Sequence, residues 1–125
     1  MYSPLYQYFE IRRDEKYSEA KPIKEIIEIL QSTGVLTKFD DSSFRNQDNF
    51  PWIEISSVNA SIGGYNSNIK SSNEKNLLTV VTSKKEANNK EMYINLLKII
   101  SKKLKWELVL EEDEVGNEQV IIYKP

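Results

Sequence analysis

Three aspartates near the middle of the chain come closest to a metal-binding pattern. Asp40, Asp41 and Asp48 lie within the segment DDSSFRNQD. A calcium-binding loop needs oxygen ligands at alternating positions, a central glycine and a terminal bidentate glutamate. The segment has none of this register, so the aspartates favour a polar connection over a cation site.

Other catalytic chemistry has few candidates in this chain. The sequence contains no cysteine and no histidine. This removes thiol nucleophiles, the usual partner of a serine nucleophile, the usual general base near neutral pH and the commonest metal ligands. The many glutamates show no spacing that selects a pair for glycoside hydrolysis. Neither GxxxxGK[ST] nor GxGxxG is present. We therefore expect a protein that is not an enzyme and that carries no metal or cofactor.

Aromatic residues and an arginine interrupt an otherwise polar stretch. Aromatic side chains and arginine are enriched at the hot spots of protein interfaces. The pattern predicts a partner-binding loop formed by Phe44, Arg45, Asp48, Phe50 and Trp52. The alternative is that Phe44 and Phe50 pack under the loop at the edge of the core. The sequence leaves both interpretations open.

Charge is segregated in the last third of the chain. Seven lysines lie between Lys84 and Lys105, against two glutamates. An acidic segment follows, and its residues Glu111, Glu112, Asp113, Glu114 and Glu118 form a second predicted partner-binding surface. Such a surface would dock a basic partner, because complementary charge speeds association and selects partners. The alternative is two solvated faces that keep the protein soluble.

Two amphipathic helices must position these surfaces. The first follows Pro22, ends near Gly34 and buries Ile23, Ile26, Ile27 and Leu30. The second begins after Asn88 or Asn89, either of which can cap it. Its predicted buried stripe consists of Met92, Leu96, Ile99 and Ile100, widened by Tyr93, Leu97 and Leu104.

Five segments have the composition or alternation of strands. They are Leu5–Ile11, Trp52–Val58, Leu77–Thr82, Trp106–Glu112 and Gln119–Lys124. The run from Leu77 lacks clean alternation, which predicts a central strand covered on both faces. We expect Val35–Pro51 to be an irregular connection and Ser61–Asn76 to be a long loop between two strands.

This order of elements predicts one α+β domain over residues 1–125. Two strand–helix–strand units joined by a hairpin describe a ferredoxin-like β-α-β-β-α-β arrangement, here with an extra C-terminal strand. The right-handed crossover rule places both helices on one face of an antiparallel sheet. The last strand would extend the sheet next to Trp106–Glu112.

Bulk properties restrict the class of partner. The formal net charge of −2 excludes a strongly basic nucleic-acid binder, and the central strand lacks the aromatics on which RNA bases stack. No apolar run approaches the length of a membrane helix. The first residues, MYSPLYQYFEIRRDE, resemble no secretory signal, so we expect a cytoplasmic protein.

The pattern SKK…NNKEMYINLLKIISKKLKWEL, where a helix leads directly into a strand that begins with tryptophan, resembles immunity proteins of bacterial polymorphic-toxin and contact-dependent inhibition systems. The resemblance covers about a third of the chain and also rests on size and element order. It implies a cytoplasmic protein that neutralises one cognate toxin protein by direct binding, without chemistry of its own.

An alternative from a different class is a small-molecule-binding or regulatory ferredoxin-like domain. It would use a sheet face lined by Tyr6, Tyr8, Trp52 and Glu54, and it could form a homodimer through that face. A third interpretation, an enzyme based on carboxylates or lysine, has no positioned pair of residues to support it.

Overall fold

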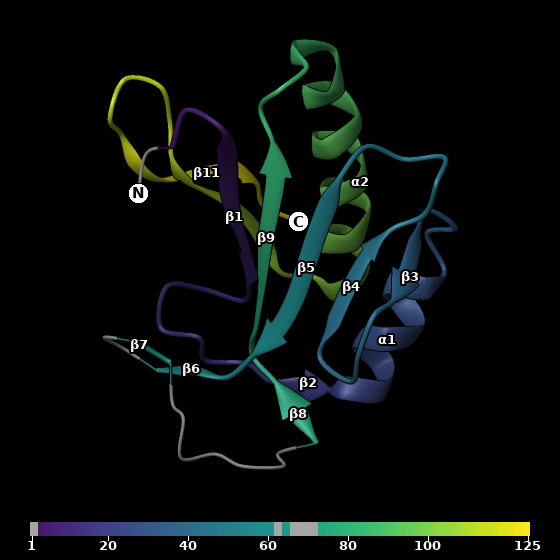
Figure 1. Ribbon diagram of the computed structural model, residues 1–125. Coiled ribbons are helices and arrows are strands. Elements are labelled where there is room, and N and C mark those ends of the chain that lie inside the picture. The colour runs from purple at the N-terminus through teal and green to yellow at the C-terminus, as the bar shows by residue number, and fades with distance from the viewer. Residues whose placement is uncertain (1–2, 62–63, 66–72) are drawn as a thin grey trace.

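The computed structural model describes residues 3–61, 64–65 and 73–125 as an α+β structure (Figure 1). Two α-helices and one short 3-10 helix occur in the described part: α1 (Ile23–Gln31), η1 (Ala87–Asn89) and α2 (Lys90–Leu104). The strands are β1 (Tyr6–Arg12), β2 (Lys21–Pro22), β3 (Leu36–Lys38), β4 (Ser43–Asn46), β5 (Ile53–Val58), β6 (Ala60–Ser61), β7 (Gly64–Tyr65), β8 (Glu74–Lys75), β9 (Leu77–Ser83), β10 (Glu107–Glu112) and β11 (Glu118–Tyr123).

Seven strands form one antiparallel sheet in the order β11-β10-β1-β9-β5-β4-β3. Strand β1 lies between β9 and β10, with Phe9 opposite Val80 on one side and opposite Leu110 on the other. The last strand, β11, pairs with β10, as the sequence predicts. Two further pairs, β2 with β8 and β6 with β7, make small two-stranded sheets.

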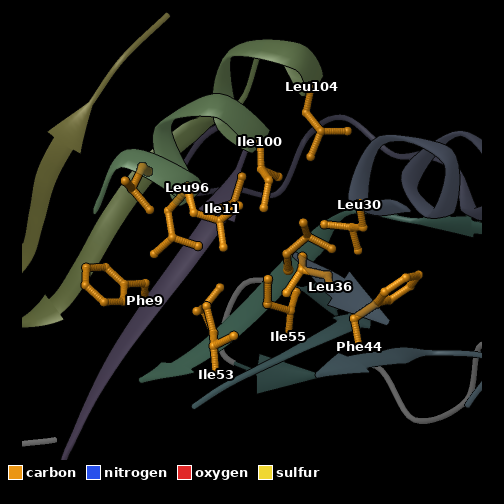
Figure 2. Packing of buried hydrophobic residues seen from close by; sticks show 14 of the residues in the cluster. Phe9, Ile11, Leu30, Leu36, Phe44, Ile53, Ile55, Leu96, Ile100 and Leu104 are labelled. Carbon is orange, nitrogen blue, oxygen red and sulfur yellow. The ribbon is translucent and has the colours of Figure 1, made fainter. Parts of the chain in front are cut away.

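One face of the large sheet carries the hydrophobic core. The alternating residues Phe9 and Ile11 of β1 point into it, and so do Ile53 and Ile55 of β5. Both helices contribute to the same cluster through Ile26, Leu30, Leu96, Leu97, Ile100 and Leu104. Figure 2 shows helix residues Leu96 and Ile100 beside Ile11. The two helices therefore cover the same side of the sheet.

The stripe on α2 is narrower than the sequence predicts. Tyr93, Leu96, Leu97, Ile100, Ser101 and Leu104 are buried. Met92 and Ile99, which we expected in the stripe, are instead exposed on its flank. Asn89 occupies the N-cap position, one of the two that the sequence predicts, but its side chain makes no capping hydrogen bond. Its side-chain amide donates to Glu86.

Two predicted connections contain strands. The stretch Val35–Pro51 holds the hairpin of β3 and β4, which extends the sheet beyond β5. The described parts of Ser61–Asn76 include β7 and β8, and the rest of that connection, including Ile69, lies outside the described residues. Strand β9 is central, but its residues alternate from Leu78 onward between buried and half-buried, so it is not covered equally on both faces.

The predicted ends of α1 are close to those observed. The helix begins one residue after Pro22 and ends at Gln31. Gly34 follows with φ of +75°, a left-handed conformation that glycine adopts without steric cost. Ile26 and Leu30 are buried, while Ile27 is partly buried against the same cluster.

Candidate functional site

Four segments that are distant in sequence meet at one end of the sheet. They are the start of β1, the β4–β5 connection, the β9–α2 connection and the β10–β11 turn, all near the top of Figure 1. Antiparallel neighbours run in opposite directions, so the start of one strand lies beside the end of the next. We call this end, formed by residues 3–6, 47–52, 83–93 and 113–117, the apical surface.

A groove of about 500 Å³ opens on the apical surface between the β4–β5 connection and the N-terminal turn of α2. Three of the residues predicted to bind a partner line it: Asp48, Phe50 and Trp52. Met92 and Tyr93 of α2 form the opposite wall. The groove thus combines aromatic and thioether surface with a carboxylate at its rim.

Trp52 is exposed, but its backbone is held in place. The Tyr93 hydroxyl donates a hydrogen bond of 2.6 Å to the Trp52 carbonyl oxygen. Phe50 packs edge-on against Tyr93 with ring centroids 6.0 Å apart. The Trp52 ring lies 5.6 Å from the Tyr6 ring, while the Trp52 residue remains 42% exposed. The structure therefore presents a large aromatic side chain on a fixed segment.

The exposed apolar surface extends beyond this tryptophan. Met92 is 42% exposed in the groove. Tyr6, whose ring contacts Trp52, and Leu5, which precedes β1, are also exposed. Leu5 is tied to the end of β9, because its carbonyl accepts a 2.9 Å hydrogen bond from the Lys84 amide. An aromatic and aliphatic patch of this composition is typical of protein-binding sites.

The β10–β11 turn is organised by Asp113. Its Oδ1 accepts hydrogen bonds from the backbone amides of Val115 and Asn117 at 3.0 and 2.8 Å, and its Oδ2 accepts one from the Asn117 side chain at 2.9 Å. These hydrogen bonds, that of the Asn117 side chain above all, lower the pKa of Asp113 below its ordinary value. The predicted binding residue Asp113 therefore shapes the turn, which leaves Glu114 and Val115 exposed at its tip.

The acidic turn and the aromatic groove are neighbours. A smaller cavity of about 150 Å³ lies between them, with Glu114 and Lys90 among its lining residues. Ser83, Glu86 and Tyr93 line both this cavity and the larger groove. The structure thus brings parts of the two surfaces predicted from sequence, around residues 48–52 and 113–114, to opposite sides of the β9–α2 connection.

Phe44 and Arg45, two of the predicted binding residues, lie on β4, outside the apical surface. Phe44 is 2% exposed and packs in the core, which is the alternative that the sequence left open for it. Arg45 follows it on β4 and points to the opposite face, where its guanidinium lies 3.7 Å from the centre of the Phe39 ring. Its Nε lies 3.5 Å from the Glu54 carboxylate. Both residues are satisfied by intramolecular contacts.

The remaining acidic residues lie along the hairpin. Glu111 and Glu112 are half-buried at the end of β10, and Glu118 is exposed at the start of β11, opposite Glu112. They place further negative charge behind the apical turn.

Sequence reasoning missed Leu5 and Met92 as surface residues of the site. Met92 fits a helical stripe and was assigned to the core for that reason. Leu5 opens an apolar strand, which offers no signal that its side chain is exposed. Their role at this surface depends on the neighbouring connections, which become visible only in three dimensions.

Within the described residues, no three acidic side chains gather closely enough to hold a metal ion. No helix in the described ranges is both long and apolar enough to cross a membrane. A scan of protein-family models, a search of curated proteins and a search of solved structures each give no match to this chain.

Proposed function

We propose that this protein is a cytoplasmic immunity protein that neutralises a cognate toxin protein by binding it through the apical surface. The observation that carries the proposal is the convergence of an exposed, backbone-anchored tryptophan with a protruding acidic turn. The resemblance of the NNKEMYINLLKIISKKLKWEL segment to immunity proteins supplies the class of partner.

The apical surface has the features of an interface hot spot. Trp52 and Tyr6 are of the residue types that contribute most binding energy, and Met92 adapts its shape to a partner. The hydrogen bond from Tyr93 to the Trp52 carbonyl oxygen fixes this segment before binding. Less conformational entropy is then lost on association, which favours tight binding.

The acidic turn supports a basic contact region on the toxin. Glu114 is exposed at its tip, and Glu118 is exposed where β11 begins. Exposed charges at the rim of an interface change the association rate and its salt dependence more than the dissociation rate. In this proposal Trp52 slows dissociation of the complex, and the acidic turn speeds association with the partner.

The fold proposed for this function is the ferredoxin-like one. The strand order β10-β1-β9-β5 and the path from β9 through α2 to β10 support it. Strand β11 would then be an addition at one edge, and the β3–β4 hairpin an addition at the other.

The test begins with the protein encoded immediately upstream of this chain. Its toxicity to a host should be suppressed by co-expression of the intact chain, and the two purified proteins should form a complex. Trp52→Ala should weaken that complex by about 2 kcal/mol or more, which is roughly thirtyfold. Phe39→Ala removes another exposed aromatic, 57% exposed against 42% for Trp52, from outside the apical surface, so it is the matched control.

The dissociation constant, measured by calorimetry, decides the result. Protection and affinity that stay unchanged in a combined Trp52→Ala and Glu114→Lys variant would refute the apical binding site. Thermal unfolding of each variant shows whether the fold is intact, and both substituted side chains are exposed, so the fold should tolerate them.

A second candidate function is binding of a small molecule near Tyr6 and Trp52, whose rings contact one another. A groove of about 500 Å³ is within the size range of ligand sites. Under this alternative, an amino acid or nucleotide would raise the melting temperature, and Trp52→Ala would abolish the shift. A homodimer through the sheet face with Tyr8 and Glu54 would appear in sedimentation as a doubled mass.

A further inference from the structure

A second groove, of about 660 Å³, lies at the opposite end of α2 from the apical surface. Its lining is strongly basic and joins three parts of the chain. Arg13 and Lys21 flank the loop after β1, Lys102 and Lys105 lie at the end of α2, and Tyr123 belongs to β11. Glu19 is the one acidic side chain among its lining residues.

The charge of Glu19 is already compensated by its neighbours. Its carboxylate lies 3.2 Å from the Lys21 ammonium and 3.7 Å from the Arg13 guanidinium. The indole N–H of the buried Trp106 donates a further hydrogen bond of 3.0 Å to it. Pro125 also lines the groove. Among the lining side chains, one carboxylate faces four cations, which gives these side chains a net charge of +3.

Lys102 and Lys105 contribute most of this excess. Both are exposed, and in the described part of the chain neither has a carboxylate within ion-pair distance. The partial negative charge of a helix C-terminus would oppose an anion here. However, the Ser101 carbonyl accepts a hydrogen bond from the Trp106 amide, and the Lys102 carbonyl accepts one from the Lys105 amide. These bonds satisfy carbonyl groups that would otherwise face the groove.

We propose that this basic groove binds a compact anion with two or more linked phosphate groups. An arginine guanidinium matches the geometry of phosphate oxygens, and lysines bind phosphates as point charges. The cations come from two separate segments, residues 13–21 and residues 102–105. Linked phosphates carry more negative charge and more acceptor oxygens than a single phosphate, so they can pair with more of these cations.

This site is independent of the proposed toxin-binding function. On α2 the apical surface ends at Tyr93 and the basic groove begins at Lys102, nine residues further along the helix, which corresponds to about 14 Å at 1.5 Å per residue. Variants of one surface should therefore leave binding at the other unchanged, so each proposal can fail without the other.

Isothermal titration calorimetry of the full chain with inorganic phosphate, pyrophosphate and triphosphate tests the inference. We expect saturable binding with one site, and affinity that rises with the number of phosphates. The double variant Lys102→Gln/Lys105→Gln should weaken triphosphate binding by about tenfold or more, because two charge-assisted contacts are lost. The matched control, Lys90→Gln/Lys98→Gln, removes two exposed lysines from the same helix outside the groove and should bind as the wild type does.

Each of the following results would overturn the inference: equal affinity of the wild type and the Lys102/Lys105 variant, equal loss in the control variant, or absence of saturable binding. A triglutamate peptide that binds more tightly than triphosphate would also overturn it, because the groove would then select carboxylates. Unchanged thermal unfolding of both variants without ligand establishes that any loss is local.

Discussion

Arg12 anchors a charged network on the sheet face opposite the core, and its replacement by methionine should be strongly destabilising. Its Nη1 lies 2.7 Å from Glu10 Oε1, and its Nε lies 3.2 Å from Glu107 Oε2. The three side chains are only 6%, 15% and 7% exposed, in the order Arg12, Glu10, Glu107. The ring of Tyr17 covers the guanidinium at 5.7 Å.

The size of the effect follows from what the substitution leaves behind. Burial alone would lower the pKa of Arg12, but the charges of Glu10 and Glu107 outweigh it and the pKa is raised. Removing one partner of a buried ion pair typically costs about 3–5 kcal/mol, because the remaining charge is left without compensation. This is a large part of the roughly 5–15 kcal/mol that stabilises a domain. The melting temperature should fall by roughly 10–20 °C.

Urea unfolding of four proteins measures this effect: wild type, Arg12→Met, Glu107→Leu and the double variant. The double variant should be more stable than Arg12→Met alone, because it also removes one of the two uncompensated carboxylates. A decrease of less than about 1 kcal/mol in the free energy of unfolding of Arg12→Met is typical of exposed ion pairs. Such a result would refute this prediction. Additive effects of the two substitutions would refute the coupling between them.

Further predictions concern the apical surface. Tyr93→Phe removes the hydrogen bond to the Trp52 carbonyl oxygen; it should cost about 1 kcal/mol and speed amide exchange at Phe50 and Trp52, and unchanged exchange would contradict the anchoring. Hydrogen bonds from the Asn117 side chain lower the pKa of Asp113. Their stabilisation of the turn should be complete above about pH 4 and disappear as the pH falls through the lowered pKa; an NMR titration in which Asp113 protonates above pH 4 would disprove this. Glu114→Lys should slow association with the proposed toxin partner and reduce the salt dependence of association, with little change in dissociation, as stopped-flow mixing can show.

The helices were predictable because their apolar residues have to be buried. The sequence predicts a buried stripe on α2 that is wider than the observed one, and the reason is geometric. Met92, Leu96 and Ile99 satisfy helical spacing as well as Tyr93, Leu97 and Ile100 do, since the two sets lie next to each other around the helix. Only the sheet decides which set it covers. The sheet covers the second set together with Leu96, and Met92 and Ile99 are left on the flank.

The β3–β4 hairpin was missed for a different reason. Its strands have three and four residues, too few for alternation to be distinguished from a polar loop. Pairing with β5 still places Phe44 opposite Ile55, so that Phe44 enters the core while Arg45 points to the other face. If the stretch is treated as a loop, the sequence does not distinguish the burial of Phe44 from that of Arg45. In a strand, neighbouring side chains point to opposite faces, so Phe44 is buried and Arg45 is not.

The apical surface could not have been derived from any single segment. Trp52 lies in the connection between β4 and β5, Met92 lies in the first turn of α2, and Glu114 lies in the turn between β10 and β11. They meet because β1 is inserted between β9 and β10, which brings the start of β1 and the turn after β10 to the end where β9 passes into α2. Trp52 and Glu114 suggested an interface from their residue types, whereas Met92 fitted the buried stripe of a helix. The pairing of strands decides which of these residues can act on one partner, and it excludes Phe44 and Arg45 from that group.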